Sequence, residues 1–256
     1  MNVVKMNNAL EIKKKTEMKY NWRSWITWGF LGLIFVLIVI MTFMRSPEHI
    51  INTLTLISSQ LKYYFLAMHI LMILLLGTGI VWKRYRNQIF FVMLFLLPLS
   101  STVVSSIYVV IPNIIFFGVI AVLVLLAVGS KKLKFDLENA KILDWIFSSI
   151  GLLFGFWYLH WIDAPIALNA LLYSPLGGVN CPTLVMMTAL LILTKRPKLN
   201  MLSTFVGVLT IYFGFFGMIM IGAYVDIVLI LCGIYLVGNN LIDWIVIRRQ
   251  KESNRT

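Results

Sequence analysis

Eight apolar stretches alternate with short polar connections along this chain of 256 residues. A helix of about 20 residues crosses the ~30 Å hydrocarbon core of a bilayer, and each stretch is close to that length or reaches it. The stretches run from Trp25 to Met44, Tyr63 to Trp82, Ile89 to Val110, Asn113 to Val128, Ile142 to Ile162, Cys181 to Thr194, Met201 to Tyr224 and Asp226 to Ile247. The pattern predicts an all-α fold, a polytopic helical membrane bundle with about eight transmembrane helices in a single domain over residues 25–247.

Positive charge is confined to every second connection. All 22 Lys and Arg residues except Arg45 and Lys62 lie in the tail 1–24, the links 83–88, 130–141 and 195–200, or the tail 248–256. Cytoplasmic connections retain positive charge, so both basic tails are predicted to be cytoplasmic. The basic residues behind the net charge of +12 are then expected to contact anionic lipids of the cytoplasmic face, and no nucleic-acid partner is expected.

Two connections on the predicted outer side carry structural signals. Ser46-Pro47-Glu48 is a typical helix start, and Ile50, Leu54, Ile57 and Leu61 follow at helical spacing, which predicts a short helix on the outer surface. Little more than Ile111-Pro112 joins the third and fourth stretches, so these form a tight hairpin. Glycines 207 and 214 lie two turns apart in the seventh stretch and predict close helix packing.

The sixth stretch is too short to span. From Cys181 to Thr194 a helix measures roughly 21 Å, and the basic residues after it hold its end at the cytoplasmic surface. Its N-terminus, for which Asn180 is the predicted cap, therefore lies roughly 9 Å inside the apolar layer. The preceding segment 164–180 is then either re-entrant or a sunken loop, and irregular backbone at that depth requires protein or a water-filled cavity around it.

Several polar residues fall at the level of this helix start. We expect an outward-facing site for a small solute, with substrate-binding residues at Asn180, Cys181, Thr183, His160, Asp163 and Asp226. Cys232 is predicted at a depth similar to that of Cys181. Each of these residues also has a structural interpretation: Asp163 and Asp226 as solvated helix caps, Cys232 as a small apolar filler, and His160 as part of an interfacial aromatic belt.

A motif in this region resembles one in a known family. Tyr173, Pro175 and Gly177, followed by Cys181-Pro182-Thr183 at the start of an apolar helix, are similar to a family of uncharacterised bacterial multi-pass membrane proteins. The hairpin with Pro112-Asn113 extends the resemblance to roughly residues 61–240. The family commonly has a second threonine where this chain has Leu184, and the first stretch is an addition. The resemblance implies the architecture and a prokaryotic plasma membrane, but no activity.

Three functions fit these observations. The first is a permease-like protein for a small solute or ion, and the second is a non-transporting subunit or assembly factor that binds a membrane protein partner. The third is an intramembrane enzyme with Cys181 as nucleophile and His160 or His69 as base. The first is preferred, an enzyme and a cofactor are not expected, and two cysteines with three histidines leave a metal site undecided.

Overall fold

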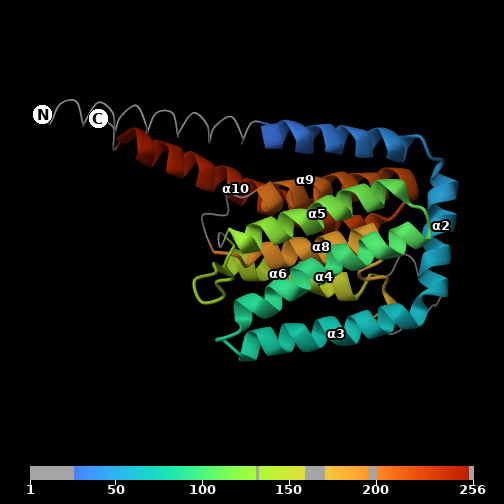
Figure 1. Ribbon diagram of the computed structural model, residues 1–256, viewed down its shortest axis with the longest axis horizontal. Helices are drawn as coiled ribbons and strands as arrows, with labels where there is room; N and C mark the ends of the chain where they lie inside the picture. Colours follow the sequence, from blue (N-terminus) through green and yellow to red (C-terminus); the bar gives the residue numbers. More distant parts are fainter. Residues whose placement is uncertain (1–25, 131–132, 159–170, 196–200, 254–256) are drawn as a thin grey trace, which may run out of the picture.

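The computed structural model describes residues 26–130, 133–158, 171–195 and 201–253, and these residues are helical without an extended sheet (Figure 1). The first described helix covers Ile26–Phe43. It is followed by α2 (Pro47–Gln60), α3 (Lys62–Val81), α4 (Arg86–Ile107), α5 (Ile111–Gly129), α6 (Ile142–Phe156), α8 (Asn180–Ile192), α9 (Met201–Phe216), the π-helical turn η1 (Gly217–Ile221), the 3-10 turn η2 (Tyr224–Asp226) and α10 (Ile227–Ser253).

The bundle has two different ends. Helix α2 runs across one end, nearly perpendicular to the other helices, and we call this the α2 end (Figure 1). At the opposite end lie the start of the first helix, the α3–α4 and α5–α6 connections, and the C-terminal end of α10 (Figure 1). We call this the basic end because, among the described connections, it contains Lys83, Arg84, Lys134 and Lys195.

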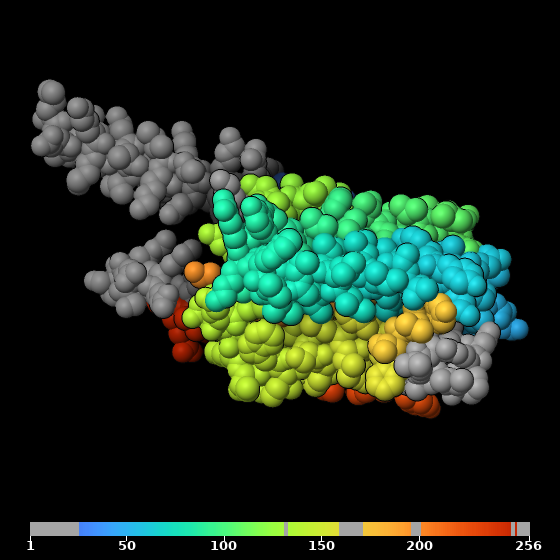
Figure 2. All heavy atoms as spheres, turned by 90° about the horizontal axis from the view of Figure 1, so that it is seen from below, coloured from blue at the N-terminus to red at the C-terminus, as the bar shows by residue number. Residues whose placement is uncertain are grey.

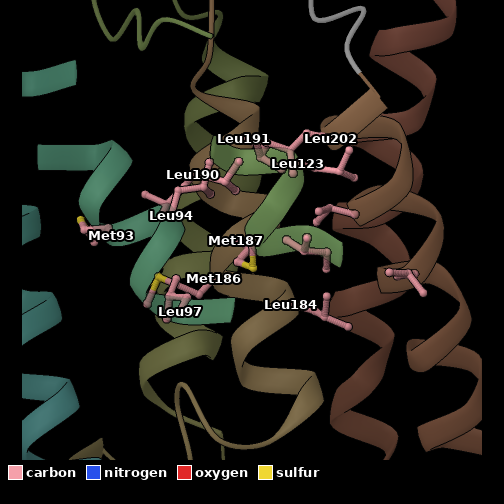
Figure 3. Close-up of a cluster of buried hydrophobic side chains, with 14 of the residues drawn as sticks. Met93, Leu94, Leu97, Leu123, Leu184, Met186, Met187, Leu190, Leu191 and Leu202 are labelled. Carbon is pink, nitrogen blue, oxygen red and sulfur yellow. The ribbon is translucent and has the colours of Figure 1, made fainter. Parts of the chain in front are cut away.

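Helix α8 is the central helix of the bundle. Every residue from Cys181 to Ile192 is buried, and the helix packs against α4, α6, α9 and α10. Its leucines and methionines meet Met93, Leu94 and Leu97 of α4 and Leu123 of α5 in the main core (Figure 3). A helix that is apolar on all sides must be enclosed on all sides, and α8 is enclosed by protein.

The outer helices instead present apolar side chains at the surface. On the first helix Phe30 is 57% exposed, and on α3 Leu74 is 61% exposed. Figure 2 shows α3 and α6 on one such face, with α2 at one end. Six of the described helices are long and apolar enough to cross a membrane, and α6 and α8 are shorter apolar helices. Surfaces of this kind face lipid, so the chain is a membrane-embedded, multi-pass helical protein.

The predicted outer helix and hairpin are confirmed as elements. Ser46 caps α2, its Oγ accepting from His49 N at 3.3 Å, and Leu54 and Ile57 on the predicted apolar side are buried. Between α4 and α5 the chain turns through Val109, which has a φ of 56°. A β-branched residue rarely adopts this left-handed conformation, and Val110 N to Ser105 O at 2.8 Å closes the turn around it.

The glycine packing predicted for the seventh stretch is also confirmed. A Cβ on Gly207 would meet Val237 Cγ2 at 2.7 Å, and one on Gly233 would meet Gly207 O at 3.0 Å. Helices α9 and α10 therefore approach each other backbone to backbone, as small residues allow. The predicted seventh helix is helical as far as Ile221 instead of Tyr224, and its last turn, η1 from Gly217, is π-helical.

The fifth predicted span is shorter than expected. It was predicted to reach Ile162, but α6 ends at Phe156, and residues 159–170 are outside the described part. Side chains from other segments approach the last carbonyls of α6: Phe156 O lies 3.1 Å from His69 Nε2, and Gly155 O accepts from Ser174 Oγ at 3.3 Å. These side chains occupy the place of a further helical turn. At the other end of the chain, α10 continues helically past Ile247 into the predicted tail.

The short sixth helix is confirmed. Helix α8 has 13 residues, which corresponds to roughly 20 Å. Its C-terminal end is held at the basic end, where Thr194 pairs with Phe135 in an isolated bridge and Lys195 N donates to Lys134 O at 2.6 Å. Since the helix cannot cover a ~30 Å layer from that end, its N-terminus lies inside the bundle near the α2 end.

Candidate functional site

The irregular segment before α8 is buried and hydrogen-bonded by protein. Residues 174–179 are all buried. Ser100 Oγ of α4 donates to Gly177 O, and Val179 N donates to Pro175 O at 3.0 Å. Gly177 has a φ of 78°, a conformation that glycine adopts without strain. Protein groups thus satisfy non-helical backbone at this depth, as predicted, while residues 164–170 of the proposed re-entrant segment lie outside the described part.

Thr183 fastens this segment to α8. Its Oγ1 accepts from Gly177 N at 2.9 Å and donates to Val179 O at 2.7 Å. Ser101 Oγ also donates to it, at 3.3 Å. The Asn180 cap is wrong: Val179 is the N-cap, and no side chain caps the helix. The hydroxyl of Thr183 orders the backbone before the helix, so Asn180 is the first helical residue.

A buried carboxylate lies beside the α8 start. Asp226, the last residue of η2, is fully buried, and its Oδ1 accepts from Tyr158 Oη at 2.5 Å. Its Oδ2 accepts from Cys181 Sγ at 3.3 Å. A Cβ on Gly217 would overlap this carboxylate, so glycine is needed there. Tyr158, Cys181 and Asp226 thus bring together three segments that are far apart in sequence.

The backbone that faces this carboxylate is irregular. Gly217 opens the π-helical turn η1, which ends at Gly222 with a φ of 76°. Ala223 N donates to Gly217 O at 2.9 Å and closes the turn. Here the turn brings Gly217 against Asp226 and makes room for a cavity.

A cavity of about 60 Å³ lies at the α2 end beside these groups. The first residues of α8 and of α5 both line it, together with residues from α2, α9, η1 and the end of the first helix. Its lining consists of Thr42, Arg45, Ile50, Thr53, Leu54, Val110, Pro112, Asn113, Val179, Asn180, Cys181, Phe213, Phe216, Gly217 and Ile221. A water molecule needs about 10–15 Å³ measured in this way, so the cavity has room for roughly four to six water-sized groups.

Two amide atoms in the lining lack hydrogen-bond partners among the described residues. Asn113 is only 3% exposed, and its Nδ2 has no hydrogen-bond partner in the described residues. The Oδ1 of Asn180 is buried and is likewise unpaired there. Leaving a buried polar atom unpaired costs about 1–3 kcal/mol, so two such atoms at one cavity require an explanation.

The predicted site residues separate into three groups. Asn180 and Cys181 line the cavity, and Asp226 contacts Cys181 directly behind it. Thr183 is buried in the segment before α8 and does not line the cavity. His160 and Asp163 lie outside the described residues.

Two further residues of chemical interest lie elsewhere. Cys232 belongs to the same buried cluster as Cys181, but its Sγ approaches Phe147 O at 3.6 Å. The ring nitrogens of His69 lie 2.7 Å from Phe65 O and 3.1 Å from Phe156 O. His69 thus links α3 to the end of α6, and Cys181 contacts Asp226 instead of an imidazole. Within the described residues no group of three or more His, Cys, Asp or Glu side chains could hold a metal ion.

Sequence reasoning missed several residues of this site. Neither Tyr158 nor Gly217 is among the residues that the sequence pattern singles out for this site. Asn113 was noted only for the hairpin, although an asparagine in the first turn of a membrane helix is itself a signal. No pattern pointed to Arg45, because its place at the cavity depends on how α2 folds across the bundle.

Comparison with protein-family models, curated proteins and solved structures yields no match for this chain. The resemblance to the uncharacterised bacterial family therefore stays a prediction. The cavity and its polar atoms are the basis for assigning a function.

Proposed function

We propose that this protein is permease-like and binds a small polar solute in the cavity at the start of α8. The observation that carries the proposal is the pair of unpaired amide atoms, Asn113 Nδ2 and Asn180 Oδ1, in a cavity within a membrane bundle. A bound solute would supply their missing hydrogen bonds. Broken or shortened helices with N-termini inside the bundle are also how many transporters form substrate sites.

The sidedness of the cavity follows from charge. The described basic connections lie at the basic end, and positive connections favour the cytoplasm. The α2 end then faces outward and the cavity is an outward-facing site. The protein is a multi-pass component of a prokaryotic plasma membrane in this proposal, with anionic lipids at its basic end.

Solute binding can be tested on the purified full-length protein in detergent. Thermal unfolding is measured with a panel of small neutral, anionic and cationic solutes, for the unaltered protein and for Asn113→Leu. A solute that binds in the cavity should raise the unfolding temperature of the unaltered protein but not that of Asn113→Leu. Ser106→Ala is the matched control: this exposed hydroxyl at the same end bonds to its own helix at Thr102 O and does not line the cavity. Any solute that passes is then tested for uptake into proteoliposomes.

The proposal fails if no solute stabilises the protein in an Asn113-dependent manner, or if a stabilising solute is never taken up. Orientation is tested separately with a membrane-impermeant thiol reagent on intact cells. Glu48→Cys on α2 should be labelled directly, and Lys83→Cys at the basic end only after permeabilisation. The native cysteines Cys181 and Cys232 are buried and give little background.

A further inference from the structure

The polar lining of the cavity contains an unpaired hydrogen-bond donor, an unpaired acceptor and one cation, and it has no carboxylate. Asn113 Nδ2 is an unpaired donor, and the guanidinium of Arg45 lies 3.2 Å from His49 Nε2. The salt bridges among the described residues involve Lys83 and Arg86, not Arg45. The carboxylate of Asp226 lies behind the wall, with both oxygens engaged by Tyr158 and Cys181.

Two helix N-termini add positive potential to these donors. The cavity is lined by Pro112 and Asn113 from the first turn of α5 and by Asn180 and Cys181 from the first turn of α8. Each helix N-terminus carries roughly +0.5 of an elementary charge. At α5 this end acts through its dipole and not through free N–H groups, because Pro112 has no N–H and Asn113 N donates to Val110 O at 3.0 Å. The field in the cavity therefore favours an anion, and Asn113 supplies a donor to one of its oxygens.

The remaining unpaired atom selects among anions. Asn180 Oδ1 is an acceptor and needs a donor on the same solute. A hydroxyl group fits, whereas an ammonium group would meet Arg45 and two positive helix ends and would keep two of its three N–H groups unpaired. The aromatic and aliphatic wall, including Phe216 and Ile221, suits a short carbon chain.

We propose that the cavity binds a short hydroxycarboxylic acid as its anion, an inference that rests on the proposed function and names its substrate class. The carboxylate faces Asn113 Nδ2 and Arg45, and the hydroxyl group donates to Asn180 Oδ1. A solute this small gains at most about 1.5 kcal/mol per heavy atom, which limits the Kd to the micromolar range or weaker.

The test measures binding to the full-length protein in lipid nanodiscs by calorimetry at pH 7 and low salt. Four probes of similar size are compared: glycolate, acetate, glycine and glycolamide, the neutral amide of glycolate. We expect glycolate to bind most tightly, acetate roughly tenfold more weakly because it lacks the hydroxyl group, and glycine and glycolamide more weakly still. Nitrate serves as the inorganic anion.

Three variants assign the contacts. Asn113→Leu abolishes binding of glycolate and acetate, while Asn180→Ala lowers glycolate affinity roughly tenfold and leaves acetate unchanged. Arg45→Gln weakens both carboxylates several-fold and reduces the dependence of their binding on salt. Ser106→Ala changes none of these values.

The outcomes separate this inference from the proposed function. Asn113-dependent binding of glycolamide or glycine in preference to glycolate, or of nitrate as tightly as glycolate, overturns the hydroxycarboxylate and leaves a solute cavity. Equal affinity for acetate and glycolate would mean that Asn180 does not bind the hydroxyl group, and it would overturn the hydroxycarboxylate. If no small solute of any charge binds in an Asn113-dependent manner, both the inference and the proposed function fail.

Discussion

Two buried aspartates lie at opposite ends of this bundle, and each accepts a hydrogen bond from a tyrosine. At the basic end Tyr235 Oη donates to Asp144 Oδ1 at 2.8 Å, and Lys141 N donates to Asp144 Oδ2 at 3.0 Å. At the α2 end Asp226 has Tyr158 at 2.5 Å and Cys181 at 3.3 Å. Asp144 is thus partly satisfied by the backbone at its own helix start. Asp226 depends on side chains from two other segments.

The surroundings of the two carboxylates also differ. Near Asp144 the loops are paired by the Phe135–Thr194 bridge and by the exposed salt bridge of Lys83 with Glu138 at 3.0 Å. A cavity lined by Asp136, Asp144 and Lys195 lies there as well. Near Asp226 there are a π-helical turn and a cavity with two unpaired amide atoms. The backbone at its own helix start holds Asp144, whereas side chains alone hold Asp226. The unpaired Asn113 Nδ2 and Asn180 Oδ1 are the reason we place the function at the α2 end.

The largest effect is expected at Gly217. In Gly217→Ala the new methyl group overlaps the carboxylate of Asp226, which cannot move without losing its bonds to Tyr158 and Cys181. We expect a destabilisation of about 3 kcal/mol or more, from overpacking and lost hydrogen bonds together. Thermal unfolding of the purified protein measures it.

Gly118→Ala is the control for helix propensity, because a Cβ there meets nothing within 4 Å. It should be neutral or slightly stabilising. In the double variant Gly217→Ala with Asp226→Ala the overlap is absent, so the combined loss should be smaller than the sum of the single losses. Strict additivity would mean that Gly217 and Asp226 do not interact.

The tyrosines give the next largest difference. Tyr158→Phe leaves Asp226 Oδ1 without a partner in a fully buried place, and we expect a loss of about 1–3 kcal/mol. Tyr235→Phe should cost less, about 0.5–1.5 kcal/mol, because Asp144 keeps a backbone N–H donor at 3.0 Å, whereas Asp226 keeps only the Cys181 thiol, which is a weak donor. The two values are compared by thermal unfolding. Equal losses would show that the two carboxylates are held alike.

Features that depend on neighbouring residues could be predicted from the sequence, whereas those that depend on tertiary contacts could not. Short-range signals were sufficient for the start of α2 at Ser46-Pro47 and for the shortness of α8, because each depends on a few consecutive residues and on helix rise. They also brought Cys181 and Asp226 to one depth. The pairing of Asp226 with Tyr158 was not predictable, since 68 residues separate the two and only the tertiary fold brings them together.

The π-helical turn was missed on different grounds. Residues Met201 to Tyr224 are predominantly apolar and fit a continuous α-helix. No residue in this segment signals the wider π-helical turn. The turn depends on Asp226 fitting against Gly217, which is a tertiary contact. The Asn180 cap failed similarly, because Thr183 bonds to Gly177 and Val179 in place of a local cap.

The third prediction is a substitution at the α2 end that should not destabilise the protein. Asn113→Leu removes an unpaired buried donor, so the protein without solute should be unchanged or stabilised by up to about 1 kcal/mol. Ser101→Ala is the matched comparison: its hydroxyl is fully buried but donates to Thr183 Oγ1, and its loss should destabilise by about 1 kcal/mol. Thermal unfolding without added solute distinguishes them. A clear destabilisation by Asn113→Leu would indicate that the amide has a structural role.

The smallest effect belongs to the exposed salt bridge at the basic end. Lys83, by hydrogen bond and by charge, and then Arg86 hold the pKa of Glu138 below its usual range. A carboxylate with a lowered pKa stabilises the fold above its ordinary pKa of about 4.3, and that contribution disappears as the pH falls through the lowered value. Glu138→Gln should therefore lower the unfolding temperature only slightly at pH 7, because Glu138 is well exposed and solvent screens the pair. The difference from the unaltered protein should shrink with added salt and vanish at acidic pH. A large, salt-independent loss at Glu138 would mean that the basic end is not the passive end of this comparison.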